Sequence, residues 1–166
     1  MEHTQEELEM IKRYQESTDE DVVDFVNAVL KGEDKLNYVT VAFLPDTAAG
    51  KIEELTGKKV EGSRVVLDIN AVQHIEKRHG INGQHDQSMK NVEDIARMGY
   101  VIMNYDEISY EQNLTTAYLD ENGKPSPLIR LSKKIDGTYY VIEAVNSSKK
   151  KRNYVITAFI SNKKEQ

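Results

Sequence analysis

Three of the four histidines in this chain lie within one short stretch, from Val66 to Asp86. They are His74, His79 and His85. Imidazole is the side chain that exchanges protons near neutral pH, and its pKa responds strongly to burial and to neighbouring charges. A cluster of histidines therefore indicates either acid–base chemistry or a metal site.

A metal site fits the spacing poorly. On a helix, His74 and His79 point about 140° apart and do not share a face. The two-histidine zinc motif needs an i, i+4 spacing and a glutamate placed as a base, and the sequence HIEKRH has neither. The chain has no cysteine, which excludes disulfides and thiolate ligands. We therefore expect no metal and no cofactor. The lesser alternative is a metal-dependent hydrolase that uses His74, His79 and His85 as ligands.

The two histidines of this helix are expected in different surroundings. Val72, Ile75 and His79 fall on one helical stripe, so His79 is expected to face the interior. There it is either a core histidine satisfied by a backbone carbonyl or a group at the edge of a cleft, where partial burial tunes an imidazole for proton transfer. His74 is expected to be the more open of the two.

Arg78 is expected on the same helical face as His74. A cation beside an imidazole lowers the imidazole's pKa, and a guanidinium can hold a phosphate through two hydrogen bonds. A base and a phosphate clamp on one face would suit phosphodiester chemistry. A surface ion pair with Glu76 is the ordinary alternative for a single arginine.

The N-terminal third reads as short amphipathic helices. Thr4 is expected to cap the first helix, and Thr18 to cap the second, which ends at Gly32. A third helix is expected between a cap at Asp46 and Gly57. The apolar residues expected to form the inward stripes of the first two helices are Leu8, Ile11, Val22, Phe25, Val26 and Val29.

The histidine helix has its own boundary signals. Asp68 or Asn70 can cap its start, and Gly80 is expected in the left-handed conformation just past its end. A further helix is expected after a cap at Ser88, closed by Gly99.

The remainder of the chain alternates as strands separated by the turn sequences DENGKP and DG. Strands are expected at 36–45, 100–110, 113–119, 126–135, 138–145 and 153–160. The economical topology is an antiparallel meander. The predicted fold class is therefore α+β, with N-terminal helices followed by an antiparallel sheet of about four to five strands.

Charge is unevenly distributed along the chain. The net charge is −6, but residues 124–164 hold ten basic residues against two acidic ones. A basic C-terminal region can bind a polyanion locally even on an acidic protein. The sequence shows neither a membrane-spanning run nor a signal peptide, so we expect a cytoplasmic location, in a bacterial host or target cell, and no membrane partner.

Several segments in a fixed order resemble a known family. They are VEG, AVQHIEKRHG, NVEDIARM followed directly by YVIMNYD, and the closing pair YYVIEAV and YVITAF. Over Thr56 to Asn162 the chain resembles the barnase–EndoU–colicin–RelE-like nucleases of phages and mobile elements.

The resemblance implies helices packed on an antiparallel sheet whose concave face holds RNA. It also implies metal-independent cleavage, in which the ribose 2′-hydroxyl attacks the adjacent phosphate and leaves a 2′,3′-cyclic phosphate. Residues 56–166 are then the nuclease domain, and residues 1–55 an acidic, mainly helical accessory segment.

The resemblance also suggests roles for individual residues. His74 and His79 match the histidine motif and are the candidates for acid and base, with the two roles open. Thr157 matches a hydroxyl residue on a late strand and is expected to orient the phosphate, which Arg130 would neutralise. Glu143 lies among apolar residues, so it is expected to pair with Arg130 or a histidine, or to line the cleft as a base. The residues expected to bind substrate are Arg78, Lys134, Tyr140, Lys149, Lys151 and Arg152.

The expected partner is RNA. Because the net charge opposes non-specific capture, a structured RNA such as a transfer RNA is favoured as substrate. A toxic activity would need a cognate immunity or antitoxin protein. The alternative is a non-catalytic, phage-derived module of the same fold that binds nucleic acid or protein.

Overall fold

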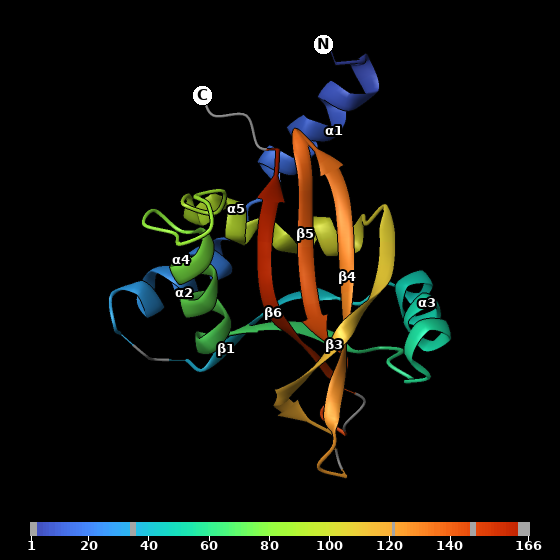
Figure 1. The fold of residues 1–166 in the computed structure, drawn as a ribbon. Helices are drawn as coiled ribbons and strands as arrows, with labels where there is room; N and C mark the ends of the chain where they lie inside the picture. Colours follow the sequence, from blue (N-terminus) through green and yellow to red (C-terminus); the bar gives the residue numbers. More distant parts are fainter. Residues whose placement is uncertain (1–2, 34–35, 121, 147–148, 163–166) are drawn as a thin grey trace.

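The computed structural model describes residues 3–33, 36–120, 122–146 and 149–162 (Figure 1). The helices are α1 (Gln5–Glu16), α2 (Glu20–Leu30), α3 (Asp46–Thr56), α4 (Ile69–His79), α5 (Val92–Ala96) and α6 (Met98–Met103). The strands are β1 (Tyr38–Phe43), β2 (Arg64–Asp68), β3 (Glu107–Leu119), β4 (Pro125–Ile135), β5 (Gly137–Ala144) and β6 (Arg152–Ser161). None of the helices formed by these residues combines the length and the apolarity needed to cross a bilayer.

The strands form one six-stranded sheet in the order β1-β2-β6-β5-β4-β3. β3 to β6 form the expected antiparallel meander, and β6 pairs in parallel with β2. In Figure 1 the α5–α6 segment crosses behind β5 and β4, and α4 stands beside β6. The α+β class is confirmed. The sheet is larger than predicted and is mixed rather than wholly antiparallel.

The register decides which side chains reach each face of the meander, because successive residues of a strand point to opposite sides. Tyr139 and Val141 are fully buried against the helices, so they mark the back face. Tyr140 pairs with Phe159 across β5 and β6, and both alternate with these buried residues. We call the opposite side, which carries Tyr140 and Phe159, the front face; it also carries Arg130.

Two elements differ from the expectation. β2 has no period-two pattern because Val65, Val66 and Leu67 are all fully buried, as in strands covered on both sides. The expected strand at 100–110 begins only at Glu107, since residues 98–103 form α6. Gly99 lies inside α6 and does not close a helix. A Cβ there would come within 2.2 Å of the Val41 carbonyl oxygen, so glycine allows α6 to pack on β1.

The N-terminal helices follow their apolar stripes with shifted caps. Thr4 caps α1 by accepting the Glu7 N–H at 3.1 Å, as expected. Asp19, not Thr18, caps α2, and Pro45, not Asp46, occupies the cap position of α3. The predicted stripe of α2 is buried throughout, but Leu8 of α1 is exposed. Tyr14 is the residue that α1 buries.

One hydrophobic core joins the N-terminal helices to the sheet. It contains buried residues of α1 and α2 together with residues of the sheet. β1, at 38–43, also pairs with β2 inside the sheet. The described residues of the first 55 therefore pack as part of the same body, and the accessory role of this segment stays a prediction.

Candidate nucleic-acid interface

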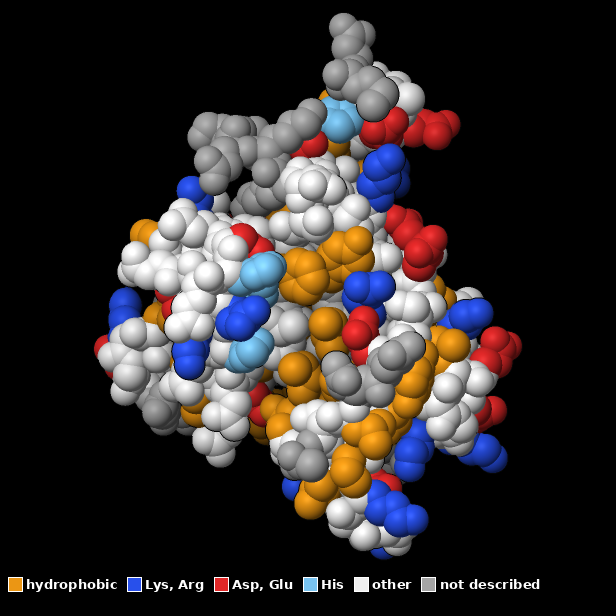
Figure 2. All heavy atoms as spheres, viewed as in Figure 1, with side chains coloured by type: hydrophobic (Ala, Val, Ile, Leu, Met, Phe, Trp, Pro, Cys, Tyr) orange, Lys and Arg blue, Asp and Glu red, His pale blue; other side chains and the backbone are white. Residues whose placement is uncertain are grey.

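The histidine helix α4 presents its side chains as its spacing predicts. Asp68 caps the helix by accepting the Ala71 N–H at 2.8 Å. His79 is 5% exposed and lies on the buried side, whereas His74 and Arg78 are exposed. Figure 2 shows histidine and basic side chains in a column over α4, next to hydrophobic side chains on β6 and β5. The helix thus forms one border of the front face.

The end of α4 differs from the predicted left-handed cap. Gly80 has φ −82° and ψ −163°, which is extended backbone. Glycine is nevertheless required, because a Cβ would lie 2.5 Å from the Glu76 carbonyl oxygen. Gly83 is tighter still, with a Cβ position 2.0 Å from the carbonyl oxygen of Asp86. The two glycines let the following loop fold directly back on the helix.

Backbone hydrogen bonds hold this loop against the last turn of α4. The His85 N–H donates to the Arg78 carbonyl at 3.0 Å, and the Met89 N–H donates to the His79 carbonyl at 2.9 Å. These bonds satisfy carbonyls that a helix end leaves without partners. As a result, Asp86 lies beside the His79 ring.

His79 is held on three sides. Its Nδ1 lies 2.9 Å from Oδ1 of Asp86, and because an ionised carboxylate only accepts, Nδ1 is the donor. Its ring stacks on Phe159 of β6 at 5.1 Å between centroids, with 25° between the planes. The His85 ring meets it edge-on at 5.7 Å. Nδ1 is therefore engaged by a carboxylate, whereas the core-histidine alternative had a backbone carbonyl in this place.

Asp86 is a site residue that sequence reasoning missed. Its Oδ1 also accepts the Ser88 N–H at 3.0 Å. Burial would raise the pKa of Asp86, but the hydrogen bonds from Ser88 and His79 outweigh it and lower the pKa. The available signal was a D-x-S turn shortly after a glycine-containing segment, and only the folded loop shows which histidine it meets.

His74 is electrostatically different from His79. The pKa of His74 is lowered, first by desolvation and then by the positive charge of Arg78. The predicted effect of Arg78 on its neighbour is thus present in the structure. The imidazole of His74 is accordingly biased toward its neutral form near pH 7.

On the sheet side, the front face carries a continuous strip of aromatic and charged groups. The Tyr140 ring lies 5.2 Å from the Phe159 ring, and the Arg130 guanidinium carbon lies 5.1 Å above Tyr140. Arg130 Nε is 3.3 Å from a carboxylate oxygen of Glu111. The strip therefore runs from the α4 border across β6, β5 and β4 to β3. Stacked aromatic groups and cations of this kind suit unpaired bases and their phosphates.

Thr157 lies on the same face as Phe159. It pairs with Ile142 of β5, two residues from Phe159 along β6, and is 9% exposed. Its hydroxyl has no hydrogen-bond partner among the described residues. Leaving a buried hydroxyl unpaired costs free energy, so this group is well suited to a ligand oxygen.

Glu143 is not where the sequence analysis expected it. It shares the back face with Tyr139 and Val141, is fully buried, and has no hydrogen-bond partner among the described residues. Arg130 pairs with another carboxylate, so the expected pairing with Glu143 is wrong. Burial raises the pKa of Glu143 to about 8, although the Asn153 amide opposes this rise without forming a hydrogen bond of ordinary geometry. Glu143 is therefore a neutral core residue at pH 7 and does not line the front face.

The other predicted cations are spread more widely. Lys134 is exposed on β4, with its backbone N–H donating to Asp106 at 2.7 Å. Lys149 and Lys151 are exposed at the β5–β6 connection. Arg152 donates to the Tyr38 hydroxyl at 2.7 Å and stacks on that ring at 4.3 Å. The rest of that basic turn, 147–148, and the basic tail from 163 lie outside the described residues.

The C-terminal half of β3 bounds the front face at its other end. Tyr118 stacks on Tyr154 of β6 at 4.2 Å, with 8° between the rings. Its hydroxyl donates to Asp68, the cap residue of α4. A long edge strand thus returns across the sheet and contacts the start of the histidine helix. This closure was not predictable from the sequence, because it joins residues of three separate elements.

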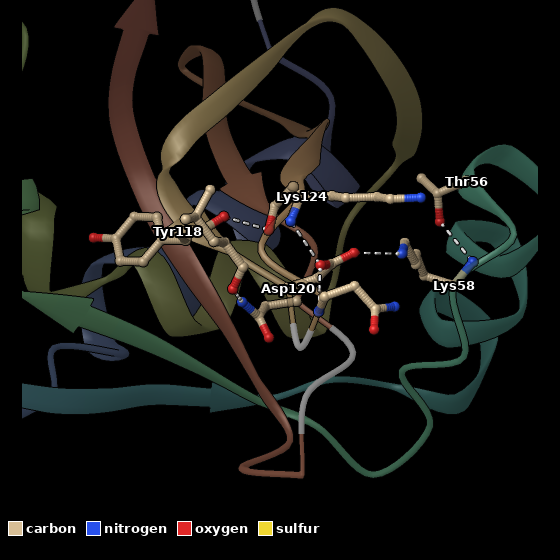
Figure 3. A network of polar contacts seen from close by, with 9 residues as sticks. Thr56, Lys58, Tyr118, Asp120 and Lys124 are labelled. Carbon is tan, nitrogen blue, oxygen red and sulfur yellow. Dashed lines mark hydrogen bonds and ion pairs between the residues drawn. The ribbon is translucent and has the colours of Figure 1, made fainter.

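A polar network anchors the turn after β3 (Figure 3). Asp120 accepts the Lys124 N–H at 2.9 Å, which closes the turn. Its other oxygen lies 3.5 Å from the Lys58 ammonium, and the Lys58 N–H donates to Thr56 at the end of α3. The turn is therefore fastened to the α3–β2 connection. Lys58 is thereby engaged in a structural contact.

The front face is an open surface rather than an enclosed cavity, as Figure 2 shows. A cavity of about 680 Å³ lies between α1, the segment from Asp86 to Arg97 and the ends of β4 and β6, so that Asp86 also borders this cavity. Among the described residues, no group of three or more histidine, aspartate or glutamate side chains is arranged to hold a metal ion.

Comparison with known proteins agrees with this arrangement. The model of one family, described as phage-Barnase-EndoU-ColicinE5/D-RelE like nuclease3, matches residues 46–166. Comparison with curated proteins and with solved structures found no match. The family match begins at α3 and includes α4, its loop and the whole meander. The chain therefore belongs to this family of phage-associated nucleases.

Proposed function

We propose that this protein is an endoribonuclease that cleaves RNA by attack of a ribose 2′-hydroxyl on the adjacent phosphate, leaving a 2′,3′-cyclic phosphate. The observation that carries the proposal is the meeting of two histidines and an arginine with a stacking surface. His74, Arg78 and His79 border the strip that contains Phe159 and Tyr140. Family membership supports cleavage of nucleic acid, and the residue types favour RNA.

The chemistry requires a base for the 2′-hydroxyl, an acid for the leaving oxygen and donors for the charge that develops on phosphate. His74 and His79 supply the two proton-transfer groups. Arg78 supplies donors, and so does the hydroxyl of Thr157, which bonds to none of the described residues. Arg130 contributes by exchanging its contact with Glu111 for a phosphate. The reaction consumes a neighbouring hydroxyl of the substrate itself, so it needs no metal-activated water.

The charge distribution bears on the choice of RNA. The net charge of −6 disfavours non-specific capture, while Lys149 and Lys151 are exposed at one end of the sheet. A structured RNA such as a transfer RNA could contact this end and the front face together. A cell that makes such a nuclease in its cytoplasm would need a cognate protein to restrain it.

The test is incubation of the purified protein with total RNA and with transfer RNA in the presence of EDTA. His74→Ala is the test variant, and His3→Ala, on the segment before α1, is the matched control. Discrete fragments that end in cyclic phosphate are expected from the unmodified protein and the control. His74→Ala is expected to be slower by about 10²- to 10⁴-fold. Intact RNA in the presence of folded protein would refute the proposal and favour a binding module.

A further inference from the structure

The loop after α4 is built to place one carboxylate. It has two glycines at positions where a Cβ would collide with backbone, and its N–H groups bond to the last carbonyls of the helix. The result is the 2.9 Å contact between Asp86 and Nδ1 of His79. Nε2 of His79 bonds to none of the described residues and is not among the solvent-inaccessible polar atoms. Nε2 is therefore the nitrogen that His79 offers to a substrate.

We propose that Asp86 is a positioning residue that holds His79 as the proton donor to the leaving 5′-oxygen, and that His74 is the base for the 2′-hydroxyl. The assignment rests on the proposed ribonuclease function and deepens it. It resolves two roles that the sequence leaves interchangeable.

The surroundings of the two imidazoles are opposite in charge. The carboxylate at Nδ1 fixes the orientation of the His79 ring and keeps a proton on Nδ1, so Nε2 is the nitrogen that exchanges a proton with the substrate. Two further titratable groups interact with His79, namely His74 on its own helix and His85 on the loop, and β6 contributes the uncharged ring of Phe159. His74 instead has Arg78 as its neighbour, which favours the neutral, proton-accepting form.

The step balances in protons and bonds. The 2′-oxygen forms a bond to phosphorus as its proton passes to His74. The bond from phosphorus to the 5′-oxygen breaks as that oxygen takes the proton from Nε2 of His79. The step leaves His74 protonated and His79 neutral, and exchange with solvent restores both.

A substrate that needs no acid separates the two roles. Replacing the 5′-oxygen at the cleaved bond by sulfur gives a leaving thiolate that departs without a proton. On ordinary RNA, His79→Ala is expected to lose about 10²- to 10⁴-fold in kcat. Asp86→Asn is expected to lose up to about 10⁴-fold, as when the carboxylate that orients a catalytic histidine is replaced by an amide. On the sulfur-containing RNA both losses are expected to shrink to a few-fold, whereas the loss in His74→Ala persists.

The division of the effect between kcat and KM is a measurement that a merely structural role would not give. Asp86 is proposed to orient the ring of His79 and not to bind the RNA, so Asp86→Asn is expected to lower kcat and to leave KM unchanged. Asp24→Asn, at an exposed position of α2, is the matched control and is expected to leave both constants unchanged.

Each contrary result has a distinct meaning. Sulfur rescue of His74→Ala instead of His79→Ala would reverse the roles and overturn the assignment. Normal kinetics of Asp86→Asn on ordinary RNA would overturn the positioning role. If Asp86→Asn does not fold, two other measurements test the proposal: sulfur rescue of His79→Ala, and the ¹⁵N chemical shifts of the His79 ring in the unmodified protein. The shifts are expected to show a hydrogen-bonded Nδ1–H. An Nδ1 without a proton would refute the pairing with Asp86. Absence of cleavage of ordinary RNA by the unmodified protein would refute the proposed function itself.

Discussion

Glu143→Gln is expected to stabilise the protein at neutral and alkaline pH. Glu143 is fully buried on the back face, without a hydrogen-bond partner among the described residues. Burial raises its pKa from 4.5 to about 8. The folded state therefore binds a proton that the unfolded state releases above pH 4.5. For an acid with a raised pKa, stability is highest below the unfolded pKa and falls as pH rises.

The size of this loss of stability follows from the difference between the unfolded and folded pKa values of Glu143. Stability falls by about 1.4 kcal/mol per pH unit between the two pKa values. The loss is roughly 3 kcal/mol at pH 7 and reaches its limit above pH 8, as an order-of-magnitude figure. Gln is neutral at every pH and close in shape, so Glu143→Gln should remove this pH dependence. The variant and the unmodified protein should be similarly stable near pH 4 and diverge steadily above it.

The assay is urea unfolding followed by circular dichroism at several pH values across this range. Glu61→Gln, at an exposed position, is the control and should follow the unmodified protein. Parallel pH dependence of stability in Glu143→Gln and the unmodified protein would refute the reasoning. RNA cleavage by Glu143→Gln is expected to be retained at neutral pH. Loss of cleavage by a folded variant would instead support the base role that the sequence suggested.

Three further outcomes test the front face. Arg78→Gln removes a charge that lowers the pKa of His74, so the acidic limb of the pH–rate profile should move to higher pH, which initial rates measure directly. Gly83→Ala places a Cβ 2.0 Å from the Asp86 carbonyl oxygen and should cost about 1–3 kcal/mol in urea unfolding; unchanged stability would show that the loop is looser than described. Tyr118→Phe removes the hydroxyl that donates to the cap residue of α4 and should cost about 1–2 kcal/mol; a neutral effect would mean that the ring stack alone holds β3 in place.

Local features of the chain were predictable where local physics determines them. The stripe of Val72, Ile75 and His79 is buried as its helical period requires, and Asp68 caps the helix. The meander of β3 to β6 follows from alternating strands and turn residues. The effect of Arg78 on its neighbouring histidine follows from a spacing of four residues on a helix.

The tertiary structure alone decided the contacts between distant segments, because neither segment's sequence indicates which other segment it will meet. The parallel pairing of β2 with β6 joins residues 64–66 to 152–154. The side of the sheet that Glu143 faces depends on the register of the whole meander. The pairing of Asp86 with His79 requires a loop that folds back on the helix at Gly83. A Cβ at this position would lie 2.0 Å from the carbonyl oxygen of Asp86 and 2.7 Å from that of Arg78, so only glycine permits the fold. The sequence by itself thus determined which histidine turns inward, because helical periodicity is local. Which carboxylate meets that histidine was decided by chain closure, because such a contact depends on every dihedral angle between the two residues.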